Sequence, residues 1–171
     1  MTESSDRAQA VAKLYEAHHH ELTRYARWCG ADDPENIASE AFDLLLESDR
    51  SIDKPLPWLR KVIHNLICNR ARRIERDRKF AALIGSDPIT TPSAEHEAAL
   101  REDQRSVINA LKQLPLRQRE VLVYRFYYGR SEAEIAADLG IAAGTVKKHA
   151  HRGIENLRKI LEGRSDHRQP R

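Results

Sequence analysis

The sequence predicts an all-α protein of two small helical domains joined by a flexible linker. Apolar residues recur at spacings of three and four over most of the 171 residues, as they do on the buried face of a helix. Only seven glycines and seven prolines interrupt the chain, a composition that favours helices over a β-sandwich. Residues 81–96 contain Gly85, Pro88 and Pro92 with no helical or strand period, and they separate the two helical halves.

The first half contains three expected helices. The first covers residues 7–29 and ends at Gly30, and the second begins where Asp32 or Asp33 precedes Pro34. The third follows the loop that contains Pro55 and Pro57. Their expected apolar stripes are Val11, Leu14, Tyr15, His18, Leu22, Tyr25, Ala26 and Cys29; Ile37, Ala41, Phe42, Leu45 and Leu46; and Leu59, Val62, Ile63, Leu66, Ile67, Ala71 and Ile74. Three such helices can enclose one core and leave a basic face outside.

The charges are separated along the chain although the net charge is only +3. Residues 31–53 contain eight carboxylates and one arginine, and residues 60–79 contain eight bases and two carboxylates. Residues 145–171 contain eight bases and three carboxylates. Two basic blocks separated by acidic ones predict two contacts with a polyanion.

Other classes of function find little support in the sequence. The N-terminus is polar and no apolar run approaches the ~20 residues that span a bilayer, so we expect a cytoplasmic protein without membrane insertion. Cys29 and Cys68 have no metal-ligand spacing, and His18, His19 and His20 point in three directions on a helix. We therefore expect no metal, no cofactor and no enzymatic activity.

The second half ends in a helix-turn-helix. Helical signal runs from residue 97 to Pro115, restarts, and stops at Gly129. Ser131 and Glu134 then have the spacing of a capping box, and Gly140 supplies the left-handed residue of a turn. In the first helix of the motif Ile135, Ala136 and Leu139 face inward, and Ile141 fills the corner.

The last helix has two opposite faces. On one side lie Val146, Ala150, Ile154, Leu157 and Leu161, and on the other lie Lys148, His151, Arg152 and Glu155. The simplest interpretation of the polar side is an ordinary solvent-exposed face on a C-terminal helix. The capping box, the turn glycine and the basic first turns together favour a recognition helix that enters a major groove of DNA.

Short motifs in both halves resemble those of a known family. The first half contains Tyr25-Ala26-Arg27, Glu40-Ala41-Phe42 and Trp58-Leu59-Arg60, with Asn65 and Arg72-Arg73 after them. The second half contains Leu114-Pro115, Arg119-Glu120-Val121, Glu134-Ile135-Ala136, Leu139-Gly140-Ile141, Gly144-Thr145-Val146-Lys147 and Arg152. With these motifs the chain from about Lys13 to Leu161 resembles bacterial RNA polymerase sigma factors of the extracytoplasmic-function (ECF) group, in the sigma-70 family.

The resemblance implies a division of the chain. Residues 7–80 would form a region 2-like domain of three or four helices, and residues 81–96 the flexible linker. Residues 97–163 would form a region 4-like helix-turn-helix domain, and residues 164–171 a disordered basic tail. The implied partners are core RNA polymerase, through its clamp helices and flap, and promoter DNA. Members of the group are often inhibited by an anti-sigma protein, and control by synthesis alone stays open.

The resemblance also implies roles for single residues. Core polymerase would bind Glu35, Asn36, Ser39 and Glu40. The melted minus-ten element would bind Trp58, Arg60, Lys61, His64, Asn65, Arg72 and Arg73. The minus-thirty-five element would be recognised by Lys147, Lys148, His151 and Arg152, with Thr145 on a phosphate at the helix N-terminus.

The chain departs from the family pattern at a few positions. Asn36-Ile37-Ala38-Ser39 stands where Asp-Leu-Val-Gln is typical, and Asn69 stands where an Asp is usual. Ala142 replaces the Ser often found before the recognition helix, which weakens that cap by ~1 kcal/mol.

Two other functions are alternatives. A free-standing transcriptional regulator would use only the helix-turn-helix and would bind duplex DNA without polymerase. A nucleic-acid-processing enzyme would use the acidic stretch as metal ligands, but its carboxylates alternate around a helix. Taken alone, Trp58 is better explained as a core aromatic residue at the start of a helix.

Overall fold

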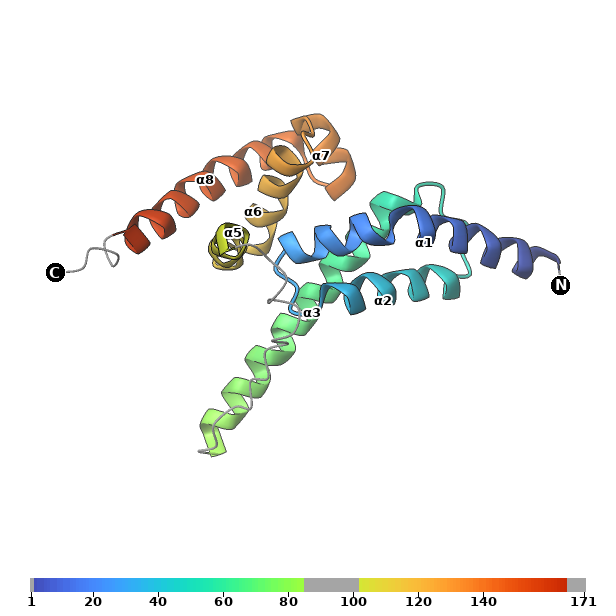
Figure 1. Ribbon diagram of the computed structural model, residues 1–171, viewed down its shortest axis with the longest axis horizontal. Coiled ribbons are helices and arrows are strands. Elements are labelled where there is room, and N and C mark those ends of the chain that lie inside the picture. The colour runs from blue at the N-terminus through green and yellow to red at the C-terminus, as the bar shows by residue number, and fades with distance from the viewer. Residues whose placement is uncertain (1, 85–101, 166–171) are drawn as a thin grey trace. The chain divides into compact units, whose positions relative to one another are not determined.

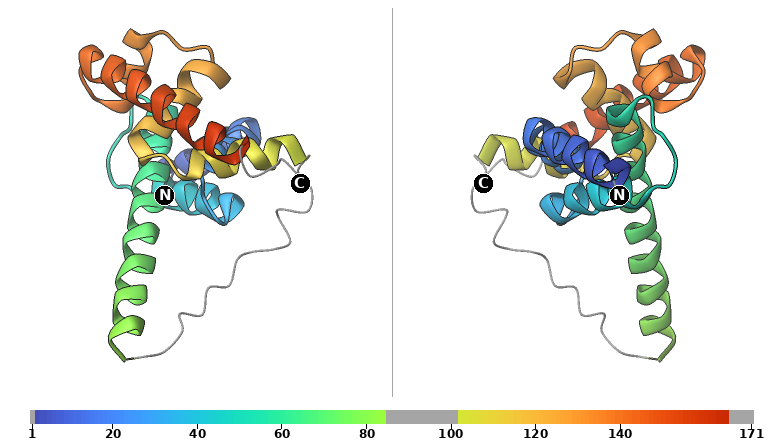
Figure 2. Two further views of the ribbon diagram at one scale, coloured as in Figure 1. Left: turned by 90° about the vertical axis from the view of Figure 1, so that its left-hand side faces the viewer. Right: turned by 90° about the vertical axis from the view of Figure 1, so that its right-hand side faces the viewer.

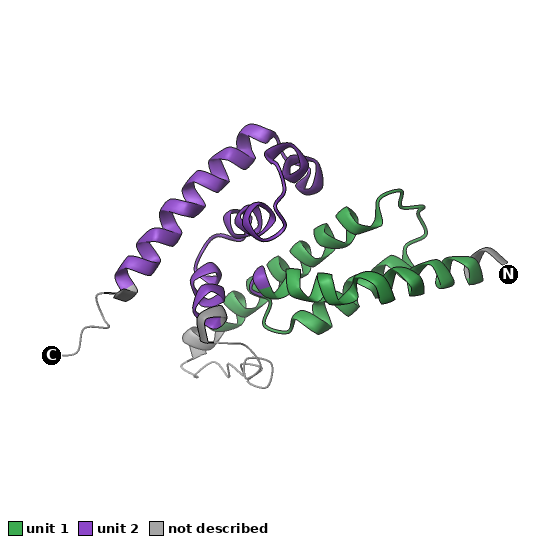
Figure 3. Cartoon of the chain, turned by 45° about the horizontal axis from the view of Figure 1, so that its top comes forward, with its two compact units in different colours: residues 1–27, 31–99 green, residues 28–30, 100–171 purple. Residues whose placement is uncertain are grey.

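The computed structural model describes residues 2–84 and 102–165, and all regular structure in these two ranges is helical. The chain forms two compact units, which Figure 3 shows in different colours. Unit 1 consists of residues 1–27 and 31–99, and unit 2 of residues 28–30 and 100–171. The prediction of an all-helical, two-part chain is therefore confirmed.

Three helices build unit 1: α1 (Thr2–Trp28), α2 (Pro34–Glu47) and α3 (Pro55–Ile84). Gly30 has a φ of +83°, which lets the chain turn after α1. The side chain of Asp33 accepts a hydrogen bond from the Asn36 backbone N–H at 3.1 Å and so caps α2, with Pro34 in the first turn. The predicted start of the second helix is thus correct.

The core of unit 1 contains residues from all three helices, among them Leu22, Tyr25, Ile37, Leu59 and Ile63, which are almost inaccessible to solvent. Polar contacts join the helices around this core. His19 Nε2 and Ser39 Oγ, 3.2 Å apart, link α1 to α2, and Arg70 pairs with Glu40 at 2.7 Å to link α3 to α2. Leu46, which the periodicity places inward, is exposed, because the helix turns it away from α1 and α3.

Helix α3 is longer than the core that it helps to build. Every residue from 71 to 79 is exposed, and Figures 1 and 2 show the second half of α3 projecting beyond α1 and α2. The helix continues to Ile84, so residues 81–84, predicted to begin the linker, are helical. Residues 164 and 165, the first two of the predicted disordered tail 164–171, are helical as well. The rest of the predicted linker, residues 85–96, and the rest of the tail, residues 166–171, lie outside the described residues.

Unit 2 contains α5 (Glu102–Lys112), α6 (Leu116–Leu122), η1 (Val123–Tyr127), α7 (Glu132–Leu139) and α8 (Ala143–Ser165). The break at Pro115 and the stop at Gly129, whose φ is +62°, agree with the prediction. The π-helical turn η1 was not predicted. It continues α6 and is closed by the hydrogen bond from Tyr128 N–H to Val123 O at 3.2 Å. Beyond it, Arg130 N–H donates to Tyr124 O at 3.0 Å.

The core of unit 2 is formed where α5, α6 and α7 cover one side of α8. Its buried side chains include Ile108, Leu111, Val121, Tyr124, Ile135, Val146 and Ala150. Arg119 is buried with them, and its guanidinium donates to the backbone oxygens of Leu111 at 2.7 Å, Lys112 at 2.7 Å and Leu114 at 3.0 Å. The last backbone carbonyl groups of a helix have no partner within it, and these hydrogen bonds satisfy those at the C-terminal end of α5. They also fix the junction of α5 with α6.

Candidate nucleic-acid interface

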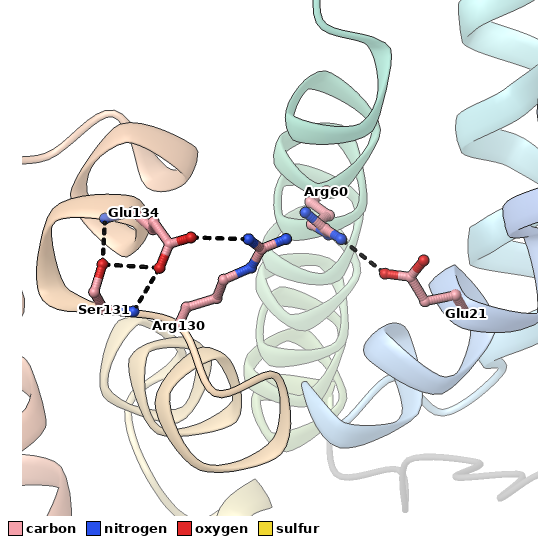
Figure 4. Close-up of polar contacts among 5 residues, drawn as sticks. All are labelled: Glu21, Arg60, Arg130, Ser131 and Glu134. Carbon is pink, nitrogen blue, oxygen red and sulfur yellow. Dashed lines mark hydrogen bonds and ion pairs between the residues drawn. The ribbon is translucent and has the colours of Figure 1, made fainter.

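The start of the helix-turn-helix is capped as the sequence predicts. Ser131 Oγ accepts from the Glu134 backbone N–H at 3.3 Å, and Glu134 Oε2 accepts from the Ser131 backbone N–H at 2.8 Å. Arg130 Nη1 lies 3.0 Å from the other carboxylate oxygen (Figure 4). The hydrogen bonds from Ser131 and Arg130 hold the pKa of Glu134 below its usual value. The first helix of the motif is therefore fixed at its N-terminus.

The turn between α7 and α8 also follows the prediction. Gly140 is left-handed with φ +64°, and its backbone N–H donates to Ala136 O. The Ile141 backbone N–H donates to the same oxygen at 3.1 Å. The carbonyl of Ala142 accepts from the N–H groups of Thr145 at 2.9 Å and Val146 at 3.1 Å, so backbone atoms alone begin α8.

The first half of α8 presents a basic surface to solvent. Val146 and Ala150 are buried, and Lys148, His151 and Arg152 are exposed on the opposite side, as their spacing predicts. Lys147 is exposed beside them and Thr145 is half-buried. Glu155 lies 3.4 Å from His151 and limits the basic surface at its C-terminal end.

The second half of α8 differs from the prediction. Ile154 and Leu161, expected to be buried, are exposed, and Leu157 is half-buried. They line an apolar groove of about 630 Å³ together with α5 and η1 residues, including Val107, Phe126 and Tyr127. Phe126 is 67% exposed. The other helices of unit 2 cover only the first half of α8, so its apolar stripe continues uncovered.

Two of the predicted minus-ten residues do not lie on the exposed face of α3. Arg60 is 5% exposed and His64 is 8% exposed. Arg60 Nη2 pairs with Glu21 Oε1 on α1 at 2.7 Å, which Figure 4 shows, and the imidazole Nε2 of His64 lies 3.5 Å from Cys68 Sγ. The prediction that these two residues lie on an outer basic surface was wrong. Helices α1 and α2 together cover more of the circumference of α3 than its apolar residues occupy.

The contact between Arg60 and Glu21 also affects titration. Burial raises the pKa of Glu21, but the hydrogen bonds and charges of Arg60 and His18 outweigh it. The pKa of Glu21 therefore lies below its usual value, and its carboxylate balances the buried guanidinium at neutral pH.

Most of the other residues predicted to bind the minus-ten element share one face of α3. Lys61, Asn65 and Arg72 are exposed, and Trp58 is half-buried at the start of the same row. Their spacing of three and four continues to Asn69 and Arg76, both exposed, which our assignment of site residues omitted. Arg73 lies to one side of this row, 4.0 Å from Asp77. We call the row Trp58, Lys61, Asn65, Asn69, Arg72 and Arg76 the α3 row.

The four residues expected to bind core polymerase lie on one face of α2, opposite its buried side. Glu35 and Asn36 are exposed in the first turn. Ser39 and Glu40 are partly covered, because Ser39 contacts His19 and Glu40 pairs with Arg70. Asp43 continues the same face and is exposed, and its position one turn after Ser39 is the signal that would have included it.

Within residues 2–84 and 102–165, no three His, Cys, Asp or Glu side chains lie so that together they could hold a metal ion. In the same ranges, none of the helices has the length and apolar character that crossing a membrane requires.

Comparison with known proteins agrees with the arrangement of these helices. Residues 99–157 match the family model described as sigma-70, region 4, which covers α5 to α7 and the first two thirds of α8. Over 164 residues the chain is 34% identical to the ECF RNA polymerase sigma factor SigL of Mycobacterium tuberculosis, covering 91% of this chain and 90% of SigL. This protein belongs to the ECF RNA polymerase sigma factors.

Further relatives agree with this assignment. SigM of M. tuberculosis, also an ECF sigma factor, is 30% identical over 158 residues, covering 89% of this chain and 77% of SigM. The sigma factor RpoE of Bartonella quintana, solved with the anti-sigma factor NepR, has a TM-score of 0.62 at 21% identity and covers 88% of this chain and 96% of RpoE. CnrH, solved with the cytosolic domain of CnrY, has a TM-score of 0.60 at 24% identity. The match covers 94% of this chain and 92% of CnrH. Both structures share the fold.

Proposed function

We propose that this sigma factor uses its two units for two parts of a promoter. Unit 2 recognises the minus-thirty-five element with α8, and unit 1 holds the melted minus-ten element along the α3 row. The observation that supports this most strongly is the exposed basic surface of Lys148, His151 and Arg152 on a helix supported from behind. Such a helix reaches base edges with its first two turns.

For the minus-thirty-five element we retain the residues of the first half of α8. Lys148, His151 and Arg152 face the bases, and Lys147 lies at the edge of the same surface. Thr145 is half-buried at the first turn, where a hydroxyl can donate to a phosphate. The capping box and the turn at Gly140 hold this surface in one orientation before DNA binds.

For the minus-ten element the proposal uses the α3 row in place of the original set. Melted bases need stacking surfaces and hydrogen-bonding groups beside a positive groove. Trp58, Lys61 and Asn65 supply these in the inner half of the row, and Arg72 and Arg76 supply charge in the outer half. Arg60 and His64 support α3 from inside and do not contact DNA in this proposal.

Two surfaces are proposed for core polymerase. The exposed face of α2 with Glu35 and Asn36, bordered by Ser39 and Glu40, docks on the clamp helices. The apolar groove of unit 2 binds the flap, because an exposed apolar surface of this kind marks a protein interface. Phe126→Ser removes the most exposed aromatic residue of the groove and should weaken core binding without unfolding unit 2.

An anti-sigma protein is proposed as a further partner, because RpoE was solved in complex with one. Purification of the chain from its uninduced host at native concentration should recover a bound inhibitor that releases when transcription is induced. Recovery of core polymerase alone in both states would argue for control by synthesis.

The experiment that tests the proposal is run-off transcription with core RNA polymerase on a library of promoter fragments at fixed salt. Start sites that need the protein and share two spaced elements would support it. A Lys148→Ala/Arg152→Ala variant should lose dependence on the upstream element, and a Lys61→Ala/Asn65→Ala variant should lose dependence on the downstream one. Duplex binding without any start site would instead favour a free-standing regulator.

A further inference from the structure

The DNA-facing side of unit 2 adjoins a second helix. The first turn of α6 lies against the middle of α8, where Asn156 Nδ2 donates to Gln118 Oε1 at 2.9 Å. Gly153 permits this approach, since a Cβ atom there would come within 3.2 Å of the Leu122 side chain and 3.4 Å of Gln118. Side chains from the start of α6 therefore lie next to those in the middle of α8.

Arg117 is the basic residue of α6 at this seam. Its Nη1 lies 3.1 Å from Oε2 of Glu120, which is completely buried, so one edge of the guanidinium is held in place. About a third of the Arg117 side chain is exposed. A guanidinium has five N–H donors, and one ion pair leaves others for a second acceptor.

His149 lies on α8 between Thr145 and Arg152, on the side that faces α6. It is half-buried, and its Nδ1 is buried without a hydrogen-bond partner among the described residues. The charged groups that act on its ring are Arg117 and Glu120 from α6 and Arg152 from α8. Burial first, and then the two arginines, lower the pKa of His149 against the opposing effect of Glu120, so the ring is neutral at neutral pH.

Arg117 from α6 and Arg152 from α8 both act on the half-buried ring of His149, and the carboxylate beside them, that of Glu120, balances only one of the two guanidinium groups. We propose that Arg117 and His149, next to the base-reading residue Arg152, bind one backbone phosphate of duplex DNA, and that His149 takes up a proton as the phosphate binds. The negative charge of the phosphate would oppose the two guanidinium groups that disfavour the imidazolium, so the charged ring gains a partner. This inference rests on the proposed DNA-binding role of unit 2 and adds a contact from outside the recognition helix.

A phosphate contact is independent of sequence, so the test uses the full chain and a mixed-sequence duplex in fluorescence anisotropy. The affinity is measured against salt for wild type and for Arg117→Gln/Glu120→Gln. This double substitution removes both charges of the pair, so that no uncompensated carboxylate is left buried. Arg125→Gln/Glu132→Gln is the matched control, because it removes an ion pair of 3.3 Å in the same unit and equally leaves the net charge unchanged.

The log–log salt slope of the Arg117 variant should fall by about 1, the value for one lost phosphate contact, and the control should keep the wild-type slope. Equal slopes in both variants, with circular dichroism showing a folded chain, would overturn the phosphate site. The result is separable from the proposed function, since a sigma factor without this site would still initiate at its promoters.

The second measurement follows affinity from pH 8 to pH 6 on the same duplex. Proton uptake means that the bound pKa exceeds the free pKa, so affinity should rise as the pH falls, by up to about tenfold per pH unit for one proton. His149→Gln should remove this increase, and His151→Gln, which changes the exposed histidine of the same helix, should retain it. Retention in His149→Gln would contradict the proton uptake.

Discussion

Helices α3 and α8 each contain a basic block, but they are covered to different extents. The first half of α8 is covered on one side only, so the residues opposite Val146 and Ala150 stay exposed. The first half of α3 is covered by both α1 and α2, and Arg60 and His64 are buried with its apolar residues. The exposure of a basic side chain therefore depends on how many helices pack around its own.

The second halves of the two helices differ in the kind of side chain that they expose. Beyond the core, α3 carries charge on every side, and ion pairs such as Lys79 with Glu75 at 3.5 Å form along the helix. The second half of α8 keeps an apolar stripe that its own unit leaves uncovered. The second half of α3 is thus charged and exposed, whereas α8 changes from an exposed basic surface to an exposed apolar one.

The largest expected effect is on the packing that supports α8. Ile135→Ala in α7 empties a fully buried position and should lower the free energy of unfolding of unit 2 by about 2–5 kcal/mol. Val107→Ala, at an exposed position of α5, should change it by less than about 0.5 kcal/mol. Thermal melts followed by circular dichroism compare the two, and equal losses would contradict the assigned core.

The next effect separates the buried and exposed basic residues of α3. Arg60→Ala removes the ion pair between Glu21 and α3 and should destabilise unit 1 by about 3 kcal/mol, the lower end of the range for a broken buried pair. The neighbouring Lys61→Ala should change stability by less than about 0.5 kcal/mol and lower promoter opening instead. Denaturant unfolding and permanganate footprinting of the melted strand measure these outcomes. A stable Arg60→Ala chain would refute the difference between the two positions.

A smaller effect is expected at the surface of α8. Lys148→Ala should cost about 1–3 kcal/mol of binding and relax the preference at one position of the upstream element. Its folding stability should stay within about 0.5 kcal/mol of wild type. Competition binding on single-base variants of a selected promoter decides the role. The same loss on every variant would reassign Lys148 to a phosphate.

The smallest effect is the dependence of unit 1 stability on acid. The pKa of Glu21 is lower in the folded chain than in the unfolded one, so its contribution is complete above the unfolded pKa and is lost as the pH falls through the folded value. Urea unfolding between pH 6 and pH 3 should show this loss. Glu21→Gln should be less stable at pH 6 and should have a shallower pH dependence; an unchanged dependence would exclude Glu21 as its source.

The elements determined by neighbouring residues were predicted from the sequence. The helix caps are made by residues that contact only their neighbours in the chain, within four positions. Local sequence patterns were therefore sufficient to predict the cap of Ser131 with Glu134, the turn at Gly140 and the cap of Asp33 before Pro34. The burial of Arg60 depends on Glu21, 39 residues earlier in the chain, and no local pattern contains that information. Leu46, Ile154 and Leu161 fit apolar stripes yet stay exposed, because a stripe does not show how far the covering helix extends.

The α3 row shows that sequence motifs also leave out residues of a surface. Lys61, Asn65 and Arg72 were identified from family motifs, and the geometry of one helix face then added Asn69 and Arg76. Arg117 and His149 were missed because they belong to two helices whose contact depends on Gly153, a residue that carries no chemical signal of its own.

The π-helical turn η1 has a consequence for changes in chain length. A π-turn accommodates about one residue more than an α-turn, and the bonds after Val123 span five and six residues. Deletion of one residue within 123–127 would let α6 continue as an ordinary helix toward Gly129, with its axis preserved. Because the π-turn absorbs its extra residue, the segment after the deletion would keep its direction, and the change would fall on the turn itself, which carries Phe126 and Tyr127 of the apolar groove. Unit 2 should therefore tolerate the loss of one residue here at the expense of the apolar groove, while the packing of α7 on α8 is kept.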